Sequence, residues 1–196
     1  GMRHFRPDPV DPQTLQRLLA AAHRAPSVGM MQPWRFLRVT DPALREAIHG
    51  LVETERQRTA EAMDGRKEEF LRLKVEGVRE AGKLLVAALM PGREAHVFGR
   101  RTLPEMDPVS CAIQNLWLAA RAEGLGLGWV SLFDPEALAE LLELPAGAKP
   151  VAVLCLGHVE AFYERPMLEE EGWTRGRPLE EMLFENRWNQ APGGPT

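Results

Sequence analysis

The chain has 196 residues, of which 44% are hydrophobic and 27% are charged, and its net charge is −4. This length suits one compact domain with a real core, and this composition excludes a globally disordered chain. An acidic chain without a basic stripe also argues against a dedicated nucleic-acid-binding protein. No apolar run approaches the roughly 20 residues of a membrane-spanning helix. The first residues lack the apolar core of a signal peptide, so we expect a cytoplasmic protein without a membrane partner.

Helices and short strands are predicted in the first half of the chain. Asp11 is expected to cap a helix that has Pro12 in its first turn and ends near residue 24. A strand is predicted over residues 34–39, where polar and apolar residues alternate. Residues 43–81 are highly charged and predict two exposed helices that form a lid, although a solvated helical face explains the charges equally well.

The second half adds more strands and a central helix. Further strands are predicted at residues 83–89, 127–133 and 151–159. A helix that starts at Asp107 and ends at Gly124 is apolar on most faces, which places it at the centre of the fold or in a subunit interface. Asp134 is expected to cap a last helix. We therefore predict one α+β domain over residues 1–190, with a small central sheet, and a disordered tail over residues 191–196.

Several familiar kinds of site are absent from the sequence. Cys111 and Cys155 lie far apart in apolar stretches, so we expect buried free thiols and no disulfide. No histidines and cysteines have the spacing of a zinc site, and we expect no bound metal. No serine lies in a Gly-x-Ser-x-Gly elbow, which argues against a hydrolase. The glycines of residues 124–128 follow a predicted helix and precede a predicted strand, whereas the glycines of a dinucleotide-binding loop follow a strand and precede a helix. They therefore indicate a tight turn that lets the backbone approach a flat group.

Two other segments are candidates for binding a ligand. Residues 25–34, Ala-Pro-Ser-Val-Gly-Met-Met-Gln-Pro-Trp, offer main-chain donors, the hydroxyl of Ser27 and a soft sulfur surface to a flat heterocycle. An ordinary connecting loop is an equally good interpretation. Arg175 and Arg177 flank a glycine and suit a phosphate bound by two guanidinium groups, although a solvated surface pair is the commoner reason for such a sequence.

Residues 25–34 resemble the Ala-Pro-Ser-x-x-x-x-Gln-Pro-Trp flavin loop of the nitroreductase-like family. Other segments are similar to one branch of it, the 5,6-dimethylbenzimidazole synthases called BluB: residues 99–107, 111–124, 128–131, 178–180 and 184–185. The resemblance covers about residues 3–188. It implies an FMN-dependent α+β fold with a small, mainly antiparallel sheet wrapped by helices. It also implies an intertwined homodimer with the flavin at its interface.

The resemblance implies an activity as well. Reduced FMN is then the substrate, molecular oxygen adds to its ring, and the products are erythrose 4-phosphate and 5,6-dimethylbenzimidazole, the lower ligand of vitamin B12. Such a flavin-destroying oxidoreductase serves cobalamin biosynthesis, and a separate flavin reductase would supply the reduced FMN. One alternative is an FMN-dependent NAD(P)H nitroreductase or dehalogenase. Another is a binding module without flavin.

The roles of family residues carry over position by position. Pro26 and Ser27 are expected at the flavin ring or ribityl chain, and Trp129 and Leu132 are expected to make main-chain contacts to the ring. Ser131 matches the serine near flavin N5, where a hydroxyl would steer the oxygen adduct or a proton. The arginines that match cofactor-binding positions are Arg3, from the N-terminal segment, and the phosphate pair Arg175 and Arg177.

The start of the chain departs from the family pattern. The family has Arg-Arg-Asp-x-Arg there, and Gly1 stands where its catalytic aspartate belongs. Gly1 before Met2 resembles a tag remnant, and if it is one, a gene start assigned too late would explain the missing Arg-Arg-Asp. A positioned acid–base group typically contributes about 10²–10⁴ in rate. We therefore expect this polypeptide to bind FMN weakly and to fragment it poorly or not at all. An upstream extension would separate a truncation from a real loss of these residues.

Overall fold

The structure is a computed structural model that describes residues 1–63, 65–73, 75–90 and 108–188. The chain divides into two compact units, Gly1–Phe162 and Tyr163–Thr196. The single domain over residues 1–190 stays a prediction. The Pro-Gly pair after the strand predicted at residues 83–89 indicates an arginine-rich loop over residues 92–106. This loop and the expected disordered tail lie outside the described residues.

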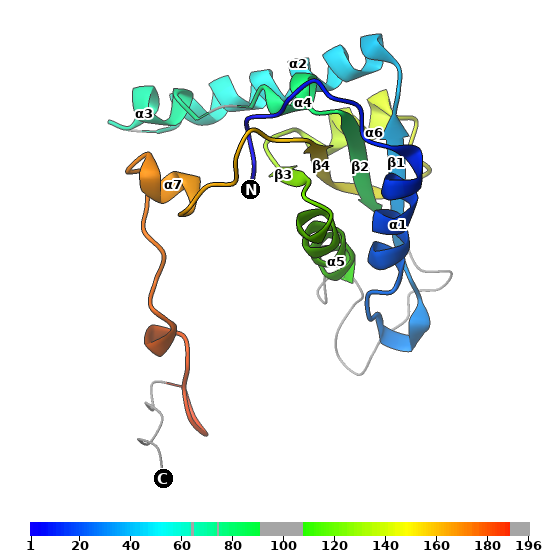
Figure 1. The fold of residues 1–196 in the computed structure, drawn as a ribbon. Coiled ribbons are helices and arrows are strands. Elements are labelled where there is room, and N and C mark those ends of the chain that lie inside the picture. Colours follow the sequence, from blue (N-terminus) through cyan, green and yellow to red (C-terminus); the bar gives the residue numbers. More distant parts are fainter. Residues whose placement is uncertain (64, 74, 91–107, 189–196) are drawn as a thin grey trace. The chain divides into compact units, whose positions relative to one another are not determined.

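Four antiparallel strands form the centre of the first unit, in the order β1-β2-β4-β3 (Figure 1). They are β1 (Trp34–Val39), β2 (Lys83–Leu89), β3 (Gly126–Val130) and β4 (Lys149–Gly157). Trp34 pairs with Leu89, Leu89 with Lys149, and Val130 with Val153. Strand β3 therefore runs toward the end of the sheet at which β1 begins, but it stops opposite the middle of β4. The predicted α+β class with a small antiparallel sheet is confirmed.

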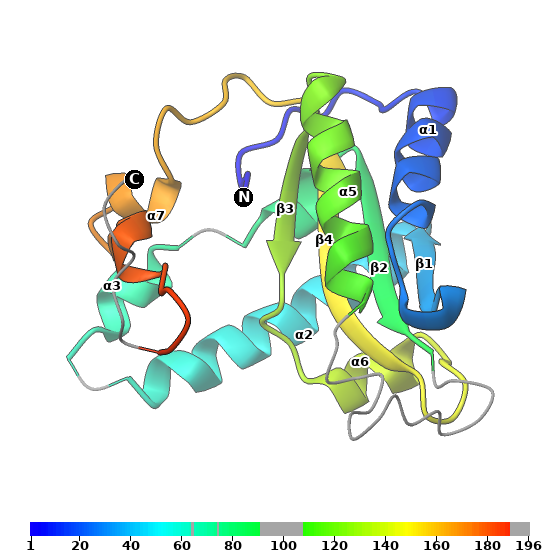
Figure 2. The same cartoon turned by 90° about the horizontal axis from the view of Figure 1, so that it is seen from below.

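Helices α1 (Pro12–His23) and α5 (Pro108–Ala122) cover one face of the sheet (Figure 2). Their apolar side chains pack with strand residues into one buried cluster, which includes Leu18, Ile113 and Leu154. Asp11 caps α1 as predicted, because its carboxylate accepts the N–H of Thr14 at 2.8 Å. Burial of this face fixes the loop between α1 and β1 at both of its ends.

The end of α5 also follows the prediction. Gly124 has a φ of 73°, and the N–H of Leu125 donates to the carbonyl of Ala120 at 2.8 Å. This left-handed residue closes the helix and turns the chain into β3. Only one face of α5 is buried in the chain, since Leu118 is 61% exposed.

The opposite face of the sheet is covered by α2 (Pro42–Glu61), α4 (Gly77–Glu80) and α6 (Pro135–Leu141) (Figure 1). Ile48 and Val52 of α2 are fully buried, in a cluster with Val86 of β2. The predicted exposure of residues 43–81 was therefore wrong for this face of α2, because apolar side chains one turn apart lie hidden among the charges. Gly65, with a φ of 75°, lies between α2 and the short α3 (Lys67–Leu71). A lid motion of these helices stays a prediction.

Two further predictions need correction. Strand β3 ends at Val130, so the expected strand over residues 127–133 is too long and Ser131 follows the strand. Cys111 is exposed rather than buried, because it lies on the open side of α5. Cys155 is buried in β4, and burial raises the pKa of its thiol to about 12. Both cysteines are free thiols.

The glycines of β3 accommodate the chain's own N-terminal segment. The N–H of Met2 donates to the carbonyl of Leu127 at 2.9 Å, and a Cβ on Gly128 would collide with the main-chain oxygen of Met2. Residues 1 and 2 therefore lie against this backbone, and the approach of a flat ligand to the same turn stays a prediction. This segment occupies the outer edge of β3.

The second unit contains two short helical segments, α7 (Met167–Glu170) and η3 (Leu179–Glu181). No helix among the described residues is long and apolar enough to cross a membrane. In the same part of the chain, no group of acidic, histidine and cysteine side chains is arranged to hold a metal ion.

Candidate functional site

The loop that carries Ser27 is held in one conformation by its own hydrogen bonds. The Ser27 hydroxyl accepts the N–H of Gln32 at 3.0 Å, and the Gln32 side chain donates to the carbonyl of His23 at 3.4 Å. The segment includes the one-turn helix η1 (Val28–Met30). The φ angle is 51° at Met30 and 44° at Gln32, so both residues have a left-handed backbone. Residues other than glycine rarely adopt this conformation, which here produces a tight turn.

This arrangement leaves the Ser27 proton available to a ligand. The hydroxyl oxygen already accepts a main-chain N–H, so the hydroxyl hydrogen can point to an outside acceptor. Ser27 is half-buried and Pro26 beside it is exposed. Ser27 therefore offers a hydrogen-bond donor and Pro26 a rigid apolar surface in the loop before β1. A flat heterocycle with polar edges could use both groups.

A cleft of about 540 Å³ adjoins the same loop. Its lining residues are Leu19, His23, Met31, Gln32, Trp34, Arg35 and Phe36. The indole N–H of Trp34 donates to Nδ1 of His23 at 3.3 Å, so Nδ1 is the unprotonated nitrogen of that ring. None of the site residues predicted from the sequence lines this cleft.

Ser131 lies at the opposite edge of the sheet. It is exposed directly after β3, while Trp129 and Leu132 on either side of it are half-buried. Trp129 pairs with Leu154 of β4 and packs against the core on the α1 and α5 face. The buried strand thus fixes the main chain next to Ser131 and leaves its hydroxyl in solvent.

The two serines lie at opposite edges of the sheet. Ser27 precedes β1, and Ser131 follows β3, which is three strands away in the order β1-β2-β4-β3. Strands are spaced by 4.7–4.9 Å, so the two edges are separated by about 14 Å. A ligand that touches both residues must either span the end of one sheet or lie between two chains.

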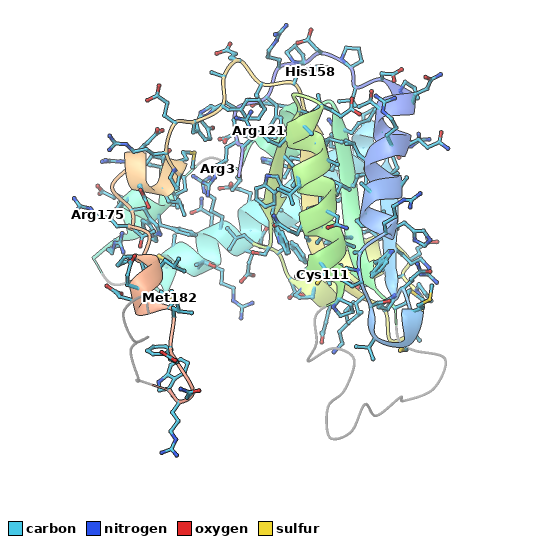
Figure 3. All side chains as sticks on the ribbon, turned by 60° about the horizontal axis from the view of Figure 1, so that its bottom comes forward. Arg3, Cys111, Arg121, His158, Arg175 and Met182 are labelled. Carbon is cyan, nitrogen blue, oxygen red and sulfur yellow. The ribbon has the colours of Figure 1, made fainter. Side chains whose placement is uncertain are left out.

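The N-terminal segment carries Arg3 along β3. The N–H of Arg6 donates to the carbonyl of His158 at 2.9 Å, which anchors this segment where β4 ends. Arg3 is half-buried and lies on the β3 side of the first unit (Figure 3). Gly1 lies within reach of Trp117 of α5 and of Gly128, three residues before Ser131.

The second unit brings the predicted phosphate pair together in one turn. Arg175 and Arg177 are exposed, and the intervening Gly176 donates its N–H to the Glu169 carboxylate at 2.7 Å. Neither guanidinium pairs with an acidic side chain among the described residues. The convergence of this pair on the two serines stays a prediction.

Three partners of the site residues were missed from the sequence. Gln32 belongs to the Gln-Pro-Trp motif, so its position in the loop could have been noticed. The contact between Met2 and Gly128 is suggested only by the glycine itself. Glu169 lies in an acidic run of three glutamates, and nothing in that run distinguishes it from its neighbours.

Comparison with known proteins gives concordant results. A family model described as Nitroreductase family matches residues 2–158. The 5,6-dimethylbenzimidazole synthase of Rhodospirillum rubrum is 44% identical over 181 residues, which cover 90% of this chain and 86% of the relative. A synthase of the same name from Rhodobacter capsulatus is 40% identical and covers 91% of this chain and 88% of its own. The structure of iodotyrosine deiodinase bound to FMN and 3-iodo-L-tyrosine has a TM-score of 0.68 at 26% identity, over 84% of this chain and 89% of that one.

Proposed function

Because the chain belongs to the nitroreductase family, we propose that it is a 5,6-dimethylbenzimidazole synthase, an oxidoreductase that fragments reduced FMN with molecular oxygen. The family and the fold class predicted from the sequence are confirmed. The observation that carries the proposal is the similarity to synthases from two bacteria over nine-tenths of the chain. The product, 5,6-dimethylbenzimidazole, would serve cobalamin biosynthesis.

The residues present suit a phosphorylated flavin. The Ser27 hydroxyl has a free proton for a ring carbonyl or ribityl oxygen, and Pro26 offers an apolar surface to the ring. The exposed guanidinium groups of Arg175 and Arg177 match a phosphate dianion in charge and hydrogen-bonding geometry. Arg3 adds a third positive charge on the β3 side. A bound reduced flavin supplies the electrons that activate oxygen.

Ser131 is the residue that we assign to the chemistry. Its exposed hydroxyl, next to main chain fixed by β3, can hold or pass a proton at flavin N5. The main chain of Trp129 and Leu132 would position the ring against this hydroxyl. Oxygen as the second substrate follows from the proposed reaction.

We propose a homodimer with the flavin between two chains. Among the described strands β1 pairs only with β2, so its outer edge is available. Several large apolar side chains are exposed: Leu118 at 61%, Leu179 at 70% and Trp188 at 80%. Association of two chains would cover such surface. It would also bring the Ser27 loop of one protomer to the β3 end of its partner, which removes the 14 Å separation (about three strand spacings) found within one chain.

Incubation with excess chemically reduced FMN in air tests the proposal directly. Mass spectrometry should detect 5,6-dimethylbenzimidazole, formed slowly because the chain lacks the Arg-Arg-Asp of the family's N-terminal segment. Unaltered FMN together with NADPH consumption would instead support an FMN-dependent nitroreductase or dehalogenase, the alternative suggested by the likeness to a deiodinase. Colourless protein that leaves FMN unchanged without NADPH consumption would indicate a binding module. A separate flavin reductase and a cytoplasmic location remain predictions.

A further inference from the structure

The turn that carries Arg175 and Arg177 is built on α7. After this short helix Gly172 has a φ of 72°, and the N–H of Trp173 donates back to the carbonyl of Leu168 at 2.8 Å. This helix closure reverses the chain and directs residues 174–177 along α7. The arginine pair is therefore not at the end of a free tail but is attached to a defined local structure.

One side chain of α7 reaches the middle of the turn. An oxygen of the Glu169 carboxylate accepts the N–H of Gly176 at 2.7 Å, a short distance typical of a charge-assisted hydrogen bond. A Cβ at position 176 would lie only 2.9 Å from the same oxygen. The glycine between the arginines thus permits the close approach that this bond needs.

Because the Glu169 carboxylate binds the N–H of Gly176, it does not neutralise the neighbouring arginines. Glu169 lies six and eight residues before the two arginines, yet no ion pair joins it to either guanidinium among the described residues. It binds the main chain between them. Both guanidinium groups consequently remain open to an external anion, on a turn whose centre is held.

We propose that Glu169 is a positioning residue for phosphate binding, which holds the turn so that Arg175 and Arg177 bind the FMN phosphate together. The inference rests on the proposed function, since it requires that the phosphorylated flavin is the ligand. Loss of the hydrogen bond frees the turn, and binding then carries the added entropic cost of ordering it. Because Glu169 acts through the phosphate, its effect should vanish for a flavin that has none.

The test compares FMN with riboflavin, which lacks the phosphate, by fluorescence titration of the full chain. Glu169→Ala should weaken FMN binding about tenfold, as expected for one lost hydrogen bond to a charged group, and leave riboflavin binding unchanged. Glu169→Gln keeps an acceptor oxygen and should restore FMN affinity to within about twofold of the wild type. With reduced FMN as substrate, Glu169→Ala should raise KM and leave kcat unchanged.

Glu170→Ala is the matched control, because it removes the same charge from the same helix. Glu170 accepts the N–H of Arg165 and does not contact Gly176. It should leave the preference for FMN over riboflavin intact. Gly176→Ala crowds the same carboxylate oxygen, which lies at the flexible end of the Glu169 side chain, so it should weaken FMN binding less than Glu169→Ala does.

Different results overturn different claims. If the wild type prefers FMN and Glu169→Ala keeps that preference, or weakens both flavins equally, the positioning role is wrong and the proposed function is untouched. If the wild type binds both flavins equally, the phosphate role of the arginines and the role of Glu169 both fail. If it binds neither flavin, the proposed function fails as well.

Discussion

Strands β2 and β4 and the segments that carry the candidate site are held in place by different interactions. In β2 all of residues 84–88 are buried, and in β4 residues 152–157 are. By contrast Pro26, Ser131 and the Arg175–Arg177 turn are exposed and positioned by neighbouring strands or single hydrogen bonds. Stability and ligand binding are therefore carried by separate residues, so substitutions should affect one without the other.

The largest effect is expected in the core. Leu154 is fully buried in β4, in the cluster shared with α1 and α5. Leu154→Ala should lower the free energy of unfolding by about 2–5 kcal/mol, because it removes apolar contacts and leaves a cavity. Urea denaturation followed by circular dichroism measures the change. A loss below about 1 kcal/mol would show that this strand is not the centre of the core.

At Ser131, directly after the edge strand β3, we expect a large loss of activity and little change in stability. Ser131→Ala should change the free energy of unfolding by no more than about 0.5 kcal/mol, since the side chain is exposed. The rate of 5,6-dimethylbenzimidazole formation should fall about 10²-fold, the usual loss for one proton-transfer group. Rates from mass spectrometry and stability from denaturation are compared on the same sample. An unchanged rate would remove Ser131 from the chemistry.

The two cysteines offer a smaller contrast of the same kind. Cys111 is exposed on α5, whereas burial of Cys155 raises its thiol pKa to about 12. Thiolate is the reactive form, so Cys155 is protected by both burial and protonation. With a thiol reagent at pH 8, one cysteine of the native chain should react rapidly and the other only after unfolding. Rapid reaction of both would contradict the burial of β4, and Cys111→Ser identifies which one reacts.

The smallest effect concerns pH. Burial, and secondarily the charge of Arg79, hold the pKa of His49 in α2 below its usual value of 6.5. Three nearby carboxylates act in the opposite direction: Glu46, Glu53 and Glu76. The unfolded chain therefore binds more protons below pH 6.5, and stability falls as the pH drops through that value. The melting temperature should decrease between pH 7 and 5.5 in the wild type, and less in His49→Gln. Equal slopes would show that His49 is not the group responsible.

Much of the fold could be predicted from local chemistry. Asp11 and Asp134 begin helices because their carboxylates accept main-chain N–H groups, and β1 occupies the predicted residues 34–39. The burial of α2 was missed because its charged residues dominate the composition and hide a narrow apolar stripe. Cys111 was misplaced because periodicity cannot identify which side of an apolar helix faces the sheet.

Less of the site could be predicted, for a physical reason. Motifs located Ser27 and the arginine pair, since the residue types themselves carry the chemistry. The hydrogen bonds from Gln32 to Ser27 and from Gly176 to Glu169 depend on left-handed backbone in a turn. Except for glycine, the residue type does not indicate that the backbone at that position is left-handed. The proposed meeting of the two edges of the sheet would require a second chain, which a single sequence does not describe.

The central claim is that one flavin is bound jointly by the Ser27 loop of one protomer and the Ser131 end of its partner. Ser27→Trp and Ser131→Trp place a large ring in each half of that site, so neither variant alone should bind FMN. Coexpression with two different tags isolates the dimer that contains one copy of each. FMN titration of this mixed dimer should give one bound flavin per two chains, because one of its two sites is intact. Complete absence of binding would contradict a shared site.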